Sequence, residues 1–406
     1  MQSAYRAFHS VETALLRVKS DIACALDRKQ MAVLILLDLS AAFDTLKHTV
    51  LLNRLQSRFG VRDDALTWIA SYLSDREQYV VIGPHTSKPR PLATGVPQGS
   101  VLGPILFTLY MAPLADIIAK HGINSHFYAD DSQLYTFFEP AHGIDSVRAT
   151  IEKCVSDIKR FMNRNFLKLN QDKTEIILFG SDFNIRKQPT ATLRIGDHAI
   201  LSQSEVRNLG AIFDSTLSMD KFVLNKCKNA MFYLRAIYRI RKSLDVDSTK
   251  TIVNAMVTSR IDFVNSLLTG ISQKTLSRLQ KVQNCAARFI TGSRKSSSIT
   301  PVLKDLHWLP VALRIKYKVL VICFNCIQKT APIYLCDLVK LYRPSRNLRS
   351  CDMFLLEIPK TKSKHGLKSF SVVAPTLWNA LPLYLRNIKS LVQFRKALKT
   401  HLFSQY

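Results

Sequence analysis

Two adjacent aspartates, Asp130 and Asp131, lie within the otherwise apolar and aromatic stretch "FYADDSQLY" (127–135). Neighbouring carboxylates repel each other, and aspartate is disfavoured in strands. The pair therefore indicates either a solvated turn or a site for a strongly positive group. A third acid, Asp38, ends the apolar run "MAVLILLDLS" (31–40), where a charge is costly unless it emerges into solvent, is paired or binds a metal.

Taken together, the three carboxylates suggest a metal site. If the strand that carries Asp38 lies beside a hairpin that carries Asp130 and Asp131, the acids converge at one edge of a sheet and cannot all stay ionised without a cation. Such hard oxygen ligands suit Mg²⁺, which is usually held by few carboxylates together with substrate phosphates. Two Mg²⁺ ions, with Mn²⁺ as the alternative, would stabilise the attacking and leaving oxygens in phosphoryl or nucleotidyl transfer.

Two further segments fit a nucleotide site. Phe43 follows Asp38 by five residues, and a ring beside a nucleotide sugar would exclude a 2′-hydroxyl and favour deoxynucleotides; an ordinary core aromatic is the alternative. In "GVPQGS", Gln98 offers an amide to an incoming nucleotide or to a template, while Gly95 and Gly99 permit close approach of the backbone. A glycine turn of this kind is weak evidence alone.

Lys173 is the candidate residue for assisting the departure of the leaving group. The stretch "FLKLNQDKTEIILFG" (166–180) predicts a hairpin that turns at Asn170–Lys173. In that turn Lys173 would protonate departing pyrophosphate or neutralise its charge. An exposed turn lysine without function is the alternative.

The elements that must position these residues alternate between helix and strand. A helix over 10–29, capped by Ser10, precedes a strand over 31–40 that is buried on both faces. The glycine loop at 94–104 leads into a helix that runs to about residue 120, with Ser100 as its cap. Two short strands fold over the aspartate pair, and a helix over 145–165 follows. From about residue 220 the pattern is almost entirely helical.

The charge distribution separates the two halves of the chain. The net charge is +27, of which residues 1–220 contribute +1 and residues 221–406 contribute +26. A neutral half followed by a strongly basic half suggests that the second half holds a polyanion for the first, and nucleic acid is the natural candidate. A generally basic, solubilising surface is the alternative.

Cysteine usage and hydropathy further limit the class of protein and its location. The eight cysteines include one CxxC, "CFNC" (323–326), without a second pair at zinc spacing, so a buried helical face is expected there. The chain is not expected to begin with a signal peptide. No apolar run is expected to reach the roughly 18 residues that indicate a membrane span. These features predict a reducing, intracellular location, in the nucleus or the cytoplasm, without membrane partners.

The order of the motifs resembles the palm of reverse transcriptases, most closely the LINE-type enzymes of non-LTR retrotransposons in the Jockey and chicken-repeat group. "HWLPVALRIKYK" and "SFSVVAPTLWNALP" near the end of the chain are also similar to that group, so the resemblance extends over essentially the whole chain. The palm motifs, in sequence order, are "DLSAAFD", "GVPQGSVLGPILFTLYM", "FYADD", "LNQDKTEIILFG" and "LGAIFD".

The resemblance implies an α+β right-hand polymerase. Partial fingers and palm would occupy residues 1–220, a helical thumb 221–300 and a basic helical extension 301–406. The implied activity is RNA-directed DNA synthesis on an RNA template, with a DNA primer and dNTPs as partners. The roles carried over by matched position are metal binding for Asp38, Asp130 and Asp131, proton donation for Lys173, and contact with the incoming dNTP for Phe43, Gln98 and Gly99.

Departures from the family pattern keep other functions open. The endonuclease domain and the upstream finger segments of full-length members are not in this chain, which is therefore expected to be truncated at its N-terminus, and Ala4 replaces the glycine usual in "QxGFR". A truncated product that binds nucleic acid without polymerising is the main alternative. An RNA-directed RNA polymerase is a weaker one, because Phe43 and "YADD" argue against it.

Overall fold

The computed structural model describes residues 2–40, 43–188, 190–195, 198–343 and 354–406. The chain folds into two compact units, each assembled from three segments. Residues 1–7, 32–178 and 186–203 form the first unit, and residues 8–31, 179–185 and 204–406 form the second. Residues 8–31 and 204–220 thus group with the C-terminal half, which the expected boundaries did not anticipate. The division into palm, thumb and extension stays a prediction.

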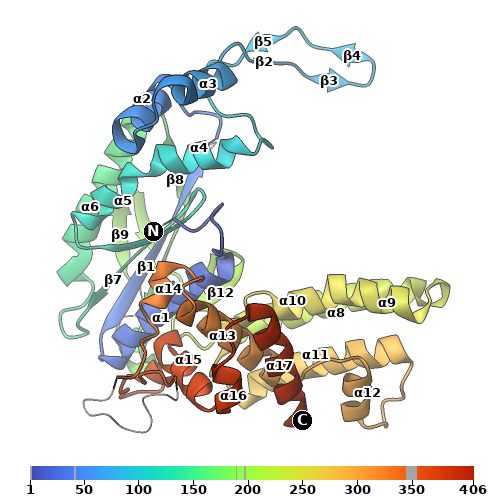
Figure 1. The fold of residues 1–406 in the computed structure, drawn as a ribbon. Coiled ribbons are helices and arrows are strands. Elements are labelled where there is room, and N and C mark those ends of the chain that lie inside the picture. Colours follow the sequence, from blue (N-terminus) through green and yellow to red (C-terminus); the bar gives the residue numbers. More distant parts are fainter. Residues whose placement is uncertain (1, 41–42, 189, 196–197, 344–353) are drawn as a thin grey trace. The chain divides into compact units, whose positions relative to one another are not determined.

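The first unit is built around a four-stranded sheet with the order β6–β7–β1–β8 (Figure 1). These strands are β1 (Met31–Ser40), β6 (Asn124–Tyr128), β7 (Asp131–Phe138) and β8 (Lys168–Phe179). In β1 the five residues 31–35 are each at most 1% exposed, and because successive side chains point to opposite faces, both faces of the strand are buried. The expected central strand is therefore confirmed.

The aspartate pair lies at the hairpin between β6 and β7. The two strands are antiparallel, with Tyr128 opposite Asp131, so Ala129 and Asp130 form the connecting turn. Ala129 has a left-handed backbone with φ of 56°. The expected folding of two strands over the aspartates is confirmed.

The hairpin expected at Asn170–Lys173 is wrong, because β8 runs through these residues as one strand. Pairing in the sheet supplies the backbone hydrogen bonds of β8 and overrides the local turn preference of asparagine and aspartate. Part of that preference survives in side-chain bonds: the Asn170 carboxamide oxygen accepts from the Lys173 N–H at 3.3 Å, and the Thr174 hydroxyl donates to the Asn170 carbonyl at 2.9 Å. Lys173 consequently extends from a strand at the edge of the sheet.

Helices cover the sheet and frame the loop that carries Gln98. The helix expected to run to about residue 120 is broken at Ala112 into α4 and α5. The helices of this part of the chain are α2 (His48–Phe59), α3 (Asp63–Leu73), α4 (Leu102–Met111), α5 (Pro113–Ala119), α6 (Asp145–Arg164) and α7 (Asp182–Lys187).

One stretch, residues 102–119, passes a test of length and apolar composition for a membrane span, contrary to the expectation that none would. It comprises α4 and α5, whose break at Ala112 interrupts it. Leu106, Phe107 and Leu114 in this stretch are buried in the unit, whereas Ile105 is 40% exposed.

Short hairpins complete the first unit. The strand expected in "EQYVVIG" is present only as two-residue pieces in an exposed extension that reaches away from α3 (Figure 1). The turn between β9 and β10 falls on residues 196–197, outside the described residues. The paired strands are β2 (Glu77–Gln78) with β5 (Arg90–Pro91), β3 (Val81–Ile82) with β4 (His85–Thr86), and β9 (Thr192–Ile195) with β10 (His198–Leu201).

The second unit is mostly helical. Its one described hairpin is formed by β11 (Glu205–Asn208) and β12 (Ala211–Asp214). Helices α8 and α11 run side by side (Figure 1). The helices are α1 (Val11–Asp27), α8 (Asp220–Ile240), α9 (Val246–Val253), α10 (Ser259–Asp262), α11 (Gln273–Thr291), α12 (Ile299–Asp305), α13 (Val311–Ile327), α14 (Ile333–Cys336), α15 (Phe370–Asn379), α16 (Leu383–Arg386) and α17 (Leu391–Ser404), with shorter turns η1 (Arg241–Ser243), η2 (Asn254–Thr258), η3 (Asn265–Leu268) and η5 (Gly366–Lys368).

Helix α1 begins as its sequence predicts. The Ser10 hydroxyl accepts from the Thr13 N–H at 3.2 Å, and the Thr13 hydroxyl oxygen accepts from the Ser10 N–H at 2.9 Å, which makes a reciprocal cap. The buried face of α1 packs against η3, α14, α15 and η5. The first helix of the chain is therefore stabilised by residues more than 200 positions later.

Two lysines are buried inside the second unit. Lys19 donates to the Leu267 carbonyl, and Lys226 donates to the Ile261 carbonyl at 3.0 Å and to that of Phe263. Burial lowers the pKa of Lys19 to about 7 and that of Lys226 to about 8. Both amines support the backbone of the 261–267 segment, so neither belongs to the basic surface.

The CxxC thiols lie inward, as expected. Cys323 and Cys326 are at most 4% exposed on α13, where Phe324 stacks on Phe394 with centroids 4.4 Å apart. The seven described cysteines are free, and Cys351 lies outside the described residues. The CxxC is thus part of the core of the unit.

Candidate active site

Asp38, Asp130 and Asp131 come from three places in the first unit: strand β1, the β6–β7 turn and the start of β7. Asp131 reaches solvent, yet the protein around its carboxylate raises its pKa to about 6, chiefly by desolvation and then by the negative charges of Asp130 and Asp38. Asp131 therefore lies within electrostatic reach of both Asp130 and Asp38.

Lys173 meets this cluster from the neighbouring strand. Its Nζ lies 3.6 Å from Oδ2 of Asp38, whose side chain is 31% exposed, while the lysine side chain is 71% exposed. β1 and β8 are adjacent in the sheet, and this adjacency brings the two charges together. The lysine partly neutralises the acids and can reorient, because most of its side chain is in solvent.

The chemistry of the donors fits a divalent cation, because several carboxylate oxygens repel one another at one place. Their positions are looser than a metal site requires: among the described residues, no three His, Cys, Asp or Glu side chains are grouped closely enough to hold one ion. In this arrangement the Lys173 ammonium supplies the positive charge nearest to Asp38. Ion binding would require the side chains to close up.

The N-terminal segment holds the aspartate turn, a contact that the sequence did not reveal. Gln2 lies beside Phe127 in a parallel bridge, and the Ser3 N–H donates to the Phe127 carbonyl at 2.9 Å. The Gln2 side chain binds both backbone groups of Ala129: Nε2 donates to its carbonyl at 3.2 Å and Oε1 accepts from its N–H at 3.1 Å. Gln2 thus holds the left-handed backbone of Ala129, the residue that directly precedes Asp130.

Tyr5 lies close to the same turn. Desolvation raises the pKa of its hydroxyl, and the charge of Asp130 and the neighbouring Tyr128 raise it further. Its side chain is 57% exposed, and its backbone is left-handed with φ of 58°. The phenol is thus a neutral group held at the rim of the acidic cluster.

The loop after β1 and the glycine loop lie back to back. Gly95 has φ of 85°, and a Cβ there would lie 2.8 Å from the Asp44 carbonyl oxygen and 2.9 Å from that of Phe43. The Gly95 N–H donates to the Leu46 carbonyl at 2.7 Å, and the Val96 N–H donates to the Phe43 carbonyl at 2.9 Å. The absence of a side chain at Gly95 thus allows these two loops to approach and fixes them against each other, while the expected approach of its backbone to a nucleotide stays a prediction.

Phe43 and Gln98 are both engaged within the unit. The half-buried Phe43 ring packs against that of the fully buried Phe107, with centroids 4.6 Å apart. Gln98 Nε2 donates to Oδ1 of Asp44 at 2.8 Å, so its amide is oriented by this acid. At Gly99, φ is 79° and a Cβ would meet nothing within 4 Å, so the backbone there is open to a ligand.

An α+β unit with acidic side chains gathered on its sheet belongs to the class of polymerase palm folds. Residues 1–213, just over half of the chain, match the family described as "Reverse transcriptase (RNA-dependent DNA polymerase)". The chain belongs to the reverse transcriptase family.

The relatives are products of mobile elements, which confirms the resemblance to LINE-type enzymes. The chain is 28% identical over 318 residues to the probable RNA-directed DNA polymerase from transposon BS of Drosophila melanogaster, covering 75% of this chain and 34% of that protein. It is 24% identical over 230 residues to the RNA-directed DNA polymerase from mobile element jockey of the same fly, covering 55% and 24%. This chain spans about a third of the length of the curated relatives it matches.

Among solved structures, apo telomerase from Candida tropicalis matches with a TM-score of 0.39 and 12% identity, covering 82% of this chain and 56% of that one. The telomerase from Candida albicans with a telomeric RNA fragment matches with a TM-score of 0.35 and 15% identity, covering 74% and 50%. Similarity at this level does not assign a role to any residue of the chain.

Proposed function

We propose that this chain is an RNA-directed DNA polymerase that extends a DNA primer 3′-hydroxyl with dNTPs on an RNA template. The proposal is supported by the negative charges of Asp38 and Asp130 acting on Asp131, with Lys173 against Asp38, in a chain of the reverse transcriptase family. Such a function would place the protein in the nucleus or the cytoplasm, where templates and dNTPs occur.

Each group has a role in this chemistry. Asp38, Asp130 and Asp131 would hold two Mg²⁺ ions, which when bound stabilise the attacking and the leaving oxygen. Lys173 would give a proton to departing pyrophosphate or neutralise it. The Phe43 ring would lie against the deoxyribose, while Gln98, oriented by Asp44, and the open backbone at Gly99 would contact the incoming nucleotide.

The second unit supports the same function through its charge. We assign the expected thumb, residues 221–300, and the basic extension, residues 301–406, to grip of the template and primer. Residues 221–406 carry +26, which suits a polyanionic partner.

Primer extension tests the proposal. An RNA template with an annealed DNA primer, dNTPs and Mg²⁺ should give incorporation with the wild-type chain and at least a 100-fold loss with Asp130→Asn. Asp145→Asn, an exposed acid at the start of α6, is the matched control and should leave incorporation unchanged. Equal incorporation by wild type and Asp130→Asn would refute the assignment.

A second candidate is a retroelement product that binds nucleic acid without polymerising. The looseness of the carboxylate cluster among the described residues favours it. It predicts salt-sensitive binding without incorporation under any metal condition, and robust incorporation by the purified chain excludes it.

A further inference from the structure

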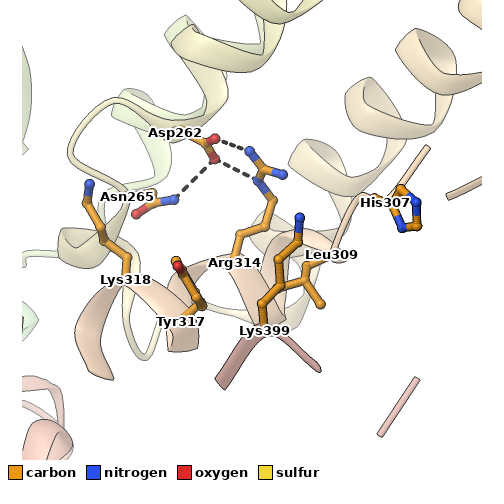
Figure 2. A pocket seen from close by; sticks show the side chains of 8 residues that line it. All are labelled: Asp262, Asn265, His307, Leu309, Arg314, Tyr317, Lys318 and Lys399. Carbon is orange, nitrogen blue, oxygen red and sulfur yellow. Dashed lines mark hydrogen bonds and ion pairs between the residues drawn. The ribbon is translucent and has the colours of Figure 1, made fainter. Parts of the chain in front are cut away.

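Two adjoining hollows in the second unit form a basic groove. The smaller, of about 250 Å³, is drawn in Figure 2, and the larger measures about 590 Å³. They share His307 and Lys399 as lining residues, so they adjoin each other. The first is lined by Asp262, Asn265, His307, Leu309, Arg314, Tyr317, Lys318 and Lys399; the second adds Lys304, Lys396, Thr400, Phe403 and Ser404.

Helical spacing explains why basic side chains line this groove. On α17, Lys396, Lys399 and Phe403 recur at intervals of three and four residues and share one face. Phe394 and Leu398 lie on the opposite face, where both are fully buried. The charged face of α17 is therefore held rigidly by the apolar one.

Helix α13 contributes the other wall with the same spacing. Arg314, Tyr317 and Lys318 share a face, and the Tyr317 hydroxyl accepts from Arg395 Nε at 3.3 Å, which fixes the ring. In Figure 2 the Tyr317, Lys318 and Lys399 side chains lie around the hollow. The groove thus combines an oriented aromatic ring with several cations.

The positive charge of the groove is only partly compensated. Arg314 Nε donates to Asp262 at 2.8 Å, and Lys318 Nζ lies 3.2 Å from Glu12. Among the described residues, neither Lys396 nor Lys399 has a carboxylate within ion-pair distance. Lys399 lies over the Phe403 ring at 5.7 Å.

Lys304, at the end of the groove, also lies beside an aromatic ring and is not paired with an acid among the described residues. It has no carboxylate at ion-pair distance in the described part of the chain, and its Nζ lies over the Tyr406 ring at 5.7 Å. Three lysines are thus available to a polyanion.

We propose that this groove binds the sugar–phosphate backbone of a single-stranded nucleic acid, with phosphates on Lys304, Lys396 and Lys399 and bases against Tyr317 or Phe403. Cations that track a backbone beside aromatic rings are the features by which proteins bind single strands. All lining residues belong to the second unit, so this site specifies where the nucleic-acid grip proposed for residues 221–406 holds a single strand, and it rests on that assignment.

The test is direct binding of labelled oligonucleotides to the full chain in EDTA without dNTPs. Nucleotide transfer cannot occur there, so failure of the proposed polymerase would leave the measurement intact. Lys396→Gln with Lys399→Gln removes two groove charges. Lys29→Gln with Arg207→Gln removes two charges from exposed side chains of the same unit that lie outside the groove and outside residues 221–406. Parallel arms use single-stranded RNA, single-stranded DNA of the same sequence and duplex DNA.

The groove variant should bind single-stranded RNA about tenfold more weakly at moderate salt. Its slope of log affinity against log salt should fall by about 1.4, or about 0.7 for each lost phosphate contact. The control should match wild type, and the RNA and DNA arms show which backbone is preferred. Equal losses in both variants, a loss of duplex binding in the groove variant as large as its loss of single-strand binding, or equal competition by polyglutamate would each overturn the proposal.

Discussion

The side chain of Gln2 binds Ala129 through both polar groups of its backbone: Nε2 donates to the carbonyl at 3.2 Å, and Oε1 accepts from the N–H at 3.1 Å. The same oxygen accepts from the N–H groups of Ser3 and Ala4 at 2.9 Å. One amide thereby joins the N-terminal segment to the turn that carries Asp130.

Removal of this amide should disturb the aspartates without abolishing the fold. Gln2→Ala is expected to lower kcat for incorporation by about tenfold, because small displacements of catalytic groups are costly. The Mg²⁺ concentration for half-maximal rate should rise, while KM for template–primer stays constant. Gln2→Glu keeps the acceptor and loses the donor, so it should be intermediate. Gln203→Ala, at an exposed glutamine of the same unit, is the control; an unchanged metal requirement in Gln2→Ala would refute the positioning role.

Lys173→Ala should reduce kcat by about 100-fold, the usual contribution of a general acid. Single-turnover incorporation measures this, and Lys173→Arg tests whether charge alone suffices. Lys168→Ala is the matched control, because Lys168 is an exposed lysine of the same strand. If both alanine variants keep the wild-type rate, Lys173 is an ordinary surface lysine.

Phe43→Val should weaken the preference for dNTPs over NTPs. Loss of the ring that meets the sugar is expected to lower the ratio of kcat/KM values by roughly 10- to 100-fold. Phe137→Val, at another half-buried phenylalanine of the unit, controls for packing. A core role alone would give both variants similar thermal destabilisation and unaltered selectivity.

Asp131→Asn should stabilise the metal-free chain at neutral pH. Because the pKa of Asp131 is raised from 3.8 to about 6, the folded chain binds more protons than the unfolded chain between these values, and stability falls as pH rises through this range. The asparagine lacks that charge, so its advantage should grow from pH 4 to above pH 6. In EDTA we expect a thermal midpoint higher by on the order of 1–2 °C at pH 7.5, since the group is solvent-screened. A pH-independent difference would contradict this reasoning.

Local sequence patterns were sufficient to predict several elements of the fold. The apolar run of β1, the Ser10 cap and the strands around the aspartate pair are short-range patterns, and the structure follows them. The site residues likewise come from one unit, as their order along the chain suggested.

Long-range pairing accounts for what the sequence could not show. Asn170 and Asp172 favour a turn, but sheet pairing keeps β8 extended through both. The Gln2–Ala129 contact spans 127 residues, and no local pattern marks it. No local pattern marks Lys19 and Lys226 as buried, although backbone carbonyls from distant segments bind their amines inside the unit.

The packing of α1 has a consequence for synthesis. Its apolar face is covered by η3, α14, α15 and η5, which are translated more than 200 residues later. At roughly 5–20 residues per second, the helix would leave the ribosome about 10–70 s before those partners exist. During that interval Leu15, Val18 and Ile22 have none of these tertiary partners, so the nascent chain should be a chaperone client until η5 and α15 have emerged.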